Sequence, residues 1–149
     1  MKIKKEVILP RLDGIQHDLE KLKKLAEKDF EEFKEEDNFA LAQFYLRRAL
    51  EGVFNIGAHI VSRKTGNRVV HYKDIAIKLG EMGIVDEDYA KDKLVKMAGY
   101  RNRLTHFYAD ITPEELYKIL REKLEDFNPF MKAIKDLMEN PQKYGFEID

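Results

Sequence analysis

Three side chains with different chemistry lie close together in the segment that runs from Arg101 to Tyr108, in the spacing Arg-x4-His-x-Tyr. Arg101 carries a permanent charge on a planar fork of donors that matches phosphate oxygens. His106 supplies an imidazole, the side-chain type that can both accept and donate a proton near neutral pH. A base beside a ribose 2′-hydroxyl and a cation on the adjacent phosphate are the minimum for RNA cleavage without a metal ion, because the RNA supplies its own nucleophile.

The spacing of this segment also limits its geometry. In an α-helix, five residues separate Arg101 from His106 by about 140°, whereas Asn102 and His106 lie one turn apart on one face. Fraying of the helix near His106 would bring the arginine and the histidine together. A single histidine cannot easily act as base and acid in the same step, so the chemistry predicts a symmetric dimer that brings together two copies of the segment.

The elements that must hold this segment are helical. Apolar residues recur at three- and four-residue steps through 12–33, and they cover two faces of a helix expected over 39–62. Further helices are expected over 73–82 and 87–106, and another begins at the capping box formed by Thr112 and Glu115. Pro129 should kink that last helix or start a new one. These elements predict an all-α fold, an antiparallel bundle of four to five helices.

Length and composition predict one helical domain over 1–138 and an irregular C-terminal tail over 139–149. The chain has 149 residues, 44% of them hydrophobic, which suits one core. It has no cysteine, and its other histidines, His17, His59 and His71, lack carboxylates at ligand spacing. We therefore expect no disulfide, metal or cofactor. Without a long apolar run the chain is expected to be soluble and cytoplasmic, with no membrane contact.

The charges leave room for a local nucleic-acid contact only. Lys and Arg number 27 against 28 Asp and Glu, so the net charge of -1 argues against wholesale electrostatic binding to nucleic acid. By default the basic loop before the 73–82 helix is a solvated turn. If RNA binds nearby, the candidates for backbone contact are Arg63, Lys64, Arg68, Lys73 and Arg103.

Each residue of the segment also has a purely structural interpretation. Arg101 falls on the inward stripe of its helix, which is costly unless the cation has partners. Glu51, the only acid between Asn38 and Lys73, is the natural partner, although it is equally placed to pair with Arg47 or Arg48 on its own helix. His106 would then be a cation at a helix C-terminus, and Tyr108 an amphipathic residue at the bundle rim.

The motif resembles the HEPN superfamily, particularly its HepT-like toxin branch. Arg101-x4-His106-x-Tyr108 stands at the end of the penultimate long helix of an all-α chain, as in that branch. The segments 48–60, 72–83 and 97–102 also resemble it, so the likeness covers about 39–130. The resemblance implies a homodimeric bundle that acts as a metal-independent ribonuclease, with the arginine and histidine of both subunits in a shared cleft.

Carried over to this chain, the resemblance implies a role for each motif residue. Arg101 would stabilise the phosphate, His106 would handle protons, and Asn102 would orient the histidine or the RNA. Glu51, as the possible partner of Arg101, is a further candidate for support of the site. The branch pairs its toxins with a small nucleotidyltransferase antitoxin that transfers AMP to the motif tyrosine, here Tyr108. Two other classes of function stay open: a non-catalytic module that binds RNA or nucleotide, and a structural partner of the nucleotidyltransferase.

Overall fold

Helices make up most of the protein in a computed structural model, which describes the backbone of residues 1–149 and every side chain except that of Tyr108. The helices are α1 (Lys5–Glu27), α2 (Phe30–Phe33), α3 (Glu36–Thr65), α4 (Tyr72–Glu81), α5 (Glu87–Tyr89), α6 (Val95–His106), α7 (Pro113–Glu122) and α8 (Asn128–Glu139). A π-helical turn, Ala90–Leu94, joins α5 to α6, and 3-10 turns cover Tyr108–Asp110, Leu124–Phe127 and Pro141–Tyr144. The all-α prediction is confirmed.

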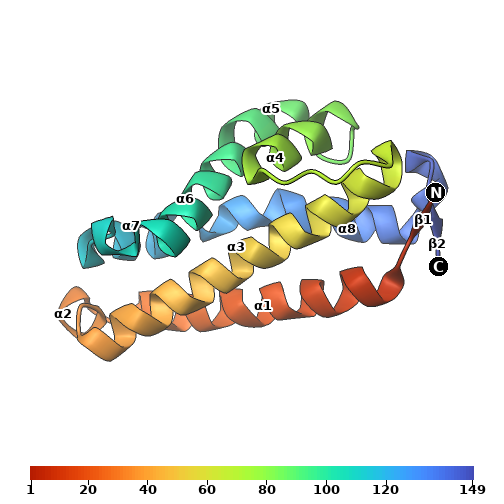
Figure 1. The fold of residues 1–149 in the computed structure, drawn as a ribbon. Coiled ribbons are helices and arrows are strands. Elements are labelled where there is room, and N and C mark those ends of the chain that lie inside the picture. Colours follow the sequence, from red (N-terminus) through yellow and green to blue (C-terminus); the bar gives the residue numbers. More distant parts are fainter.

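The long helices α1 and α3 lie side by side and span the molecule, with α8 behind α3 and the α4–α6 layer above it in Figure 1. Their facing stripes supply much of one buried core, which is closed by large side chains from several helices. Its fully buried aromatic members are Phe33, Phe54, Phe130 and Phe146. No helix in the described part of the chain combines the length and apolar character needed to cross a bilayer.

Helix ends follow local signals. Gly66 ends α3 with φ 75°, and its N–H donates to the carbonyl oxygen of Ser62 at 2.8 Å, a left-handed cap that favours glycine. The Thr112 hydroxyl accepts the N–H of Glu115 at 3.1 Å, so Thr112 caps α7 as predicted. The other half of the predicted capping box is replaced, because the Glu115 carboxylate accepts hydrogen bonds from Arg103. Pro129 lies in the first turn of α8, which confirms the prediction that it starts a new helix.

Two expected boundaries were wrong. The first helical stretch is not one helix, because α1 ends at Glu27 and Asp29 caps the short α2 by accepting the N–H of Glu32 at 2.9 Å. The C-terminal residues are not irregular, because β2 (Glu147–Ile148) pairs in parallel with β1 (Lys2–Ile3) and Phe146 is buried. A two-residue strand is too short to show apolar alternation, so the sequence gives no signal for it.

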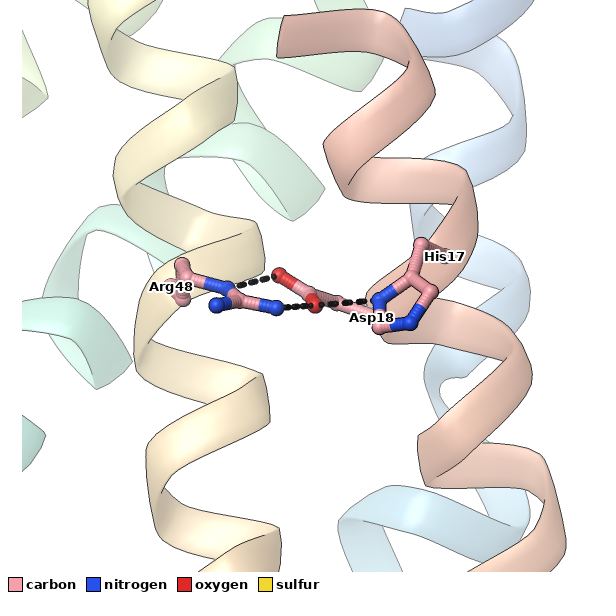
Figure 2. Close-up of polar contacts among 3 residues, drawn as sticks. All are labelled: His17, Asp18 and Arg48. Carbon is pink, nitrogen blue, oxygen red and sulfur yellow. Dashed lines mark hydrogen bonds and ion pairs between the residues drawn. The ribbon is translucent and has the colours of Figure 1, made fainter.

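An ion pair between α1 and α3 joins the two long helices (Figure 2). Asp18 is the only charged residue that is fully buried in the described part of the chain, at 1% exposed. Arg48 donates to it from Nε at 2.9 Å and from Nη2 at 2.5 Å, and His17 Nδ1 lies 3.2 Å from the same carboxylate. The possible pairing of Arg48 with Glu51 was therefore wrong, because the partner of Arg48 comes from another helix.

Candidate functional site

Residues of the segment that contains the Arg-x4-His-x-Tyr motif border an open depression between the start of α4 and the end of α6. Val70, His71, Tyr72, Lys73 and Asp74 line it from the first helix and the loop before it, and Arg101, Asn102, His106 and Phe107 line it from the second. Because the first turn of α4 has free backbone N–H groups, this edge of the depression favours an anion. The structure thus brings four of the predicted site residues, Lys73, Arg101, Asn102 and His106, to one surface.

Helix α6 ends at His106, where the sequence predicts the helix end, and it does not fray before that residue. The helix continues through His106, and Phe107 caps it with φ -132° and an N–H that donates to the carbonyl oxygen of Arg103 at 2.8 Å. Arg101 and His106 therefore leave the helix at different angles. They border the same depression because the start of α4 packs beside the end of α6.

Arg101 is held by three neighbours without being fully bonded by any of them. Its guanidinium lies 4.3 Å from the centre of the Tyr72 ring, and Nη1 donates to Asn102 Oδ1 at 3.4 Å. Nε lies 3.8 Å from Glu51 Oε1, close enough for an ion pair but too far for a hydrogen bond. The Nε atom is buried and has no hydrogen-bond acceptor among the described residues. The Arg101 side chain as a whole is 20% exposed.

These contacts position the guanidinium and leave part of its bonding capacity open. An unsatisfied buried donor costs about 1–3 kcal/mol, so such groups are uncommon in folded proteins. The Tyr72 face and the Glu51 carboxylate both favour a cation at this place. The η nitrogens make one long hydrogen bond among the described residues, to Asn102, so an incoming phosphate in the depression would add acceptors for them.

The remaining predicted residues of the segment are arranged differently. Asn102 is oriented toward Arg101, and no hydrogen bond joins it to His106 among the described side chains. His106 is exposed, with its ring centre 6.4 Å from that of Phe107. The side chain of Tyr108 lies outside the described residues, so the predicted modification site has a backbone position only.

The structure separates the five basic candidates for RNA contact. Lys73 lines the depression, and Arg68 lines a neighbouring one that shares Val70 and Tyr72 with it. The guanidinium of Arg103 instead donates two hydrogen bonds to the carboxylate of Glu115 on α7, at 2.5 and 2.9 Å.

That contact holds the pKa of Glu115 below its usual range. Arg63 and Lys64 are at the far end of α3, where the ammonium of Lys64 lies 5.7 Å from the Phe146 ring centre. Only Lys73 of the five therefore joins Arg101.

Several lining residues escaped the sequence analysis. His71, Tyr72 and Asp74 come from a segment about one turn long at the start of α4, far from Arg101 in the chain. Their types carry no spacing signal of their own, and only the packing of α4 on α6 brings them to Arg101. Phe107, an exposed ring inside the motif, was present in the sequence but had no predicted role.

The structure is that of an all-α helical-bundle protein with an arginine and a histidine at one open depression. Residues 15–134 match the family described as HepT-like, ribonuclease HepT-like. The chain belongs to this HepT-like family.

Individual relatives agree with this assignment. A protein named tRNA nuclease HepT from Aphanizomenon flos-aquae is 25% identical over 134 residues, which cover 89% of this chain and 90% of the relative. Two solved structures share the fold. A tri-AMPylated Shewanella oneidensis HEPN toxin in complex with MNT antitoxin has a TM-score of 0.76 at 22% identity, covering 87% of this chain and 96% of that one. A toxin–antitoxin crystal structure with AMP-PNP has a TM-score of 0.77 at 19% identity, covering 87% and 98%.

Proposed function

We propose that this protein is the ribonuclease toxin of a toxin–antitoxin pair and that it cleaves RNA by attack of a ribose 2′-hydroxyl on the adjacent phosphate. The observation that carries the proposal is the incompletely bonded guanidinium of Arg101 in the same open depression as exposed His106. Membership of the HepT-like family supports it, and so does the tRNA nuclease named among the relatives.

The proposed step needs a base, an acid and a cation. His106 takes the proton from the 2′-hydroxyl as the 2′-oxygen forms a bond to phosphorus. The bond from phosphorus to the 5′-oxygen breaks, and a proton is delivered to that leaving oxygen. Arg101 stabilises the charge that gathers on the other phosphate oxygens. The products are a 2′,3′-cyclic phosphate and a free 5′-hydroxyl, and the chain's own residues supply each role without a metal ion.

A homodimer completes this scheme. One His106 acts as the base and the His106 of a second subunit donates the proton to the 5′-oxygen, because a single imidazole is in only one protonation state at a time. The expectation is a shared cleft in which both Arg101 side chains face the same RNA. Light scattering at micromolar concentration should find a dimer, and a monomer that cleaves RNA at full rate would overturn the shared cleft.

The partner that silences the toxin is a nucleotidyltransferase of the MNT type. The Shewanella toxin described as tri-AMPylated and bound to MNT antitoxin supports this part. The phenol oxygen of Tyr108 would attack the α-phosphate of ATP, forming a bond to AMP and releasing pyrophosphate. Mass spectrometry after co-expression with such an enzyme should find AMP on Tyr108, and a Tyr108→Phe variant should lose it from that position.

The direct test is RNA cleavage in the presence of EDTA. Purified protein should cut RNA and leave cyclic phosphate ends, and both Arg101→Ala and His106→Ala should abolish most of this activity. Full activity in both variants would contradict the proposal. Tight RNA binding by a pure dimer without cleavage would assign the depression to a non-catalytic binding module instead.

A further inference from the structure

Phe107 leaves an aromatic ring in water beside the proposed site. The residue is 59% exposed, and its ring centre is 6.4 Å from that of His106. Its backbone N–H already caps α6 by donating to Arg103, so the cap needs no aromatic side chain. Because folding gains little from an apolar group that stays exposed, packing within the chain does not account for this ring.

The ring of Phe107 borders two depressions. One is the depression that contains Arg101 and His106. The second lies against the exposed side of α6 and shares Phe107, Lys73 and Asn102 with the first. The second depression, called here the Gly99 groove, is lined by Lys73, Lys96, Gly99, Tyr100, Asn102, Arg103 and Phe107. Two of these residues are aromatic and three are basic. Arg103 and Lys96 are paired with Glu115 and Asp92, so Lys73 is the cation of the groove without an ion pair among the described residues. Aromatic rings beside a cation are the combination that binds single-stranded nucleic acid.

Gly99 keeps this groove open. It lies inside α6, where glycine weakens a helix relative to alanine. A Cβ built at Gly99 would meet no atom within 4 Å, so no neighbour in this chain requires the glycine. An occupant from outside the chain that approaches the helix closely would require it.

We propose that Phe107 stacks on the nucleobase next to the scissile phosphate and that this base occupies the Gly99 groove. The inference rests on the proposed ribonuclease function, since it places the base beside a phosphate held by Arg101. A base offers a flat face to the ring, and its phosphates find Lys73 at the junction of the two depressions. Phe107 is thus a residue that binds and positions the RNA, while Arg101 and His106 act on the phosphate.

The proposed dimer brings a second subunit to the depression of Arg101 and His106, but the ring of Phe107 suits a nucleobase better than it suits that subunit. Protein interfaces bury about 800 Å² on each partner around an apolar centre. Among the described residues, Val70 is the only other large apolar side chain that is exposed in either depression, at 68%. The rest of the rim includes Lys73, Asp74 and Arg103, so a ligand with one flat ring and negative charge matches the surface better.

The test separates base contacts from backbone contacts. The probes are a short 2′-O-methyl oligoadenylate and a 2′-O-methyl oligomer of the same length without bases, neither of which can be cut because the 2′-oxygen is blocked. Fluorescence anisotropy should show that Phe107→Ala binds the oligoadenylate about tenfold more weakly and the abasic oligomer as the wild type does. Phe107→Trp should keep the affinity, and Phe107→Leu should lose most of it.

Two further variants sharpen this result. Gly99→Leu should weaken binding of the oligoadenylate without lowering the melting temperature, because leucine fills the groove and suits a helix. The matched control is Phe44→Ala on α3, where an exposed ring lies 4.9 Å from the guanidinium of Arg48, away from both depressions. This variant should bind both probes as the wild type does.

Several outcomes would overturn the stacking proposal. They are an equal loss of affinity for both probes in Phe107→Ala, full affinity in Phe107→Leu, and conversion of a dimer to a monomer by Phe107→Ala. Cleavage of unmodified RNA by the wild type is measured in parallel. If the wild type cleaves RNA but binds both probes equally well, the stacking proposal alone fails. A preference that depends on Phe107, without cleavage, supports stacking and removes the ribonuclease proposal alone.

Discussion

Two arginines of this protein, Arg48 and Arg101, differ in opposite directions in burial and in hydrogen bonding. Arg48 is the more exposed, with 48% of its side chain accessible, yet it makes two hydrogen bonds to a fully buried carboxylate. Arg101 is the more buried, and it has one long hydrogen bond, a loose ion pair and an unsatisfied Nε. Burial alone would rank Arg101 as the structural residue. Hydrogen-bond satisfaction reverses that order, because a folded protein normally leaves few buried donors without partners.

The comparison assigns different work to the two sites. The Arg48 pair joins α1 to α3, and both carboxylate oxygens of Asp18 accept a hydrogen bond from Arg48 (Figure 2). Arg101 is positioned by Tyr72 and Glu51 but still has donors for an added acceptor. We infer that removing Arg48 mainly changes stability, whereas removing Arg101 mainly changes function.

The largest expected effect is on cleavage by Arg101→Met. Methionine keeps an apolar stem over Tyr72 and removes the donors, so RNA cleavage should fall at least about 100-fold, as for loss of a group that stabilises a transition state. Thermal unfolding should change little, because Glu51 is partly exposed and water can solvate it. Arg101→Lys should fall between the two proteins, since it keeps the charge without the planar fork. A large drop in melting temperature would make Arg101 a structural residue like Arg48.

The next effect is on stability. Arg48→Met leaves the buried Asp18 carboxylate with only His17 as a polar neighbour, and we expect a loss of about 2–3 kcal/mol in the free energy of unfolding. Urea unfolding followed by circular dichroism measures it, with cleavage assayed well below the transition. Cleavage per folded molecule should stay unchanged.

A second substitution sharpens the stability result. Replacing both partners, in Asp18→Leu with Arg48→Met, should recover most of the lost free energy, because no buried charge is left unpaired. If the double variant were as unstable as the single one, the packing of the arginine stem, rather than its ion pair, would hold α1 to α3.

Features that depend on nearby residues could be predicted from the sequence. The presence of the long helices, the cap at Thr112 and the inward position of Arg101 all depend on residues within a few helical turns. Periodicity and spacing describe such features well. The sequence also offered Glu51 as a partner for Arg101, because it is the only acid in a long stretch of chain.

Other features that join distant segments carried no such signal. Asp18 and Arg48 are thirty residues apart and on different helices, and nothing in either local sequence marks them as a pair. The meeting of Tyr72 with Arg101 depends on how α4 packs against α6. Satisfaction of the Arg101 donors is likewise a property of the packed structure, so the strongest evidence for the site appears only there.

The smallest expected effect concerns a third arginine, Arg103. It tests whether an arginine with satisfied hydrogen bonds contributes little to cleavage even at the edge of the site. Arg103 was a candidate for RNA contact, but Glu115 engages its guanidinium with two hydrogen bonds, so Arg103→Gln should lower cleavage only a few-fold. At pH 7 this variant should lose less than about 1 kcal/mol of stability, as expected for a partly exposed pair.

The pH dependence of that loss identifies its cause. The contact with Arg103 lowers the pKa of Glu115, so unfolding takes up a proton in the acid range. The stabilisation is complete above the ordinary glutamate pKa of about 4.3, and it disappears as the pH falls through the lowered value. The difference in melting temperature between wild type and Arg103→Gln should therefore shrink between about pH 5 and pH 3. Lys132→Gln, at an exposed lysine without an ion pair among the described residues, should show no such trend. A difference that persists at low pH would mean that Arg103 stabilises α6 by packing rather than through its ion pair with Glu115.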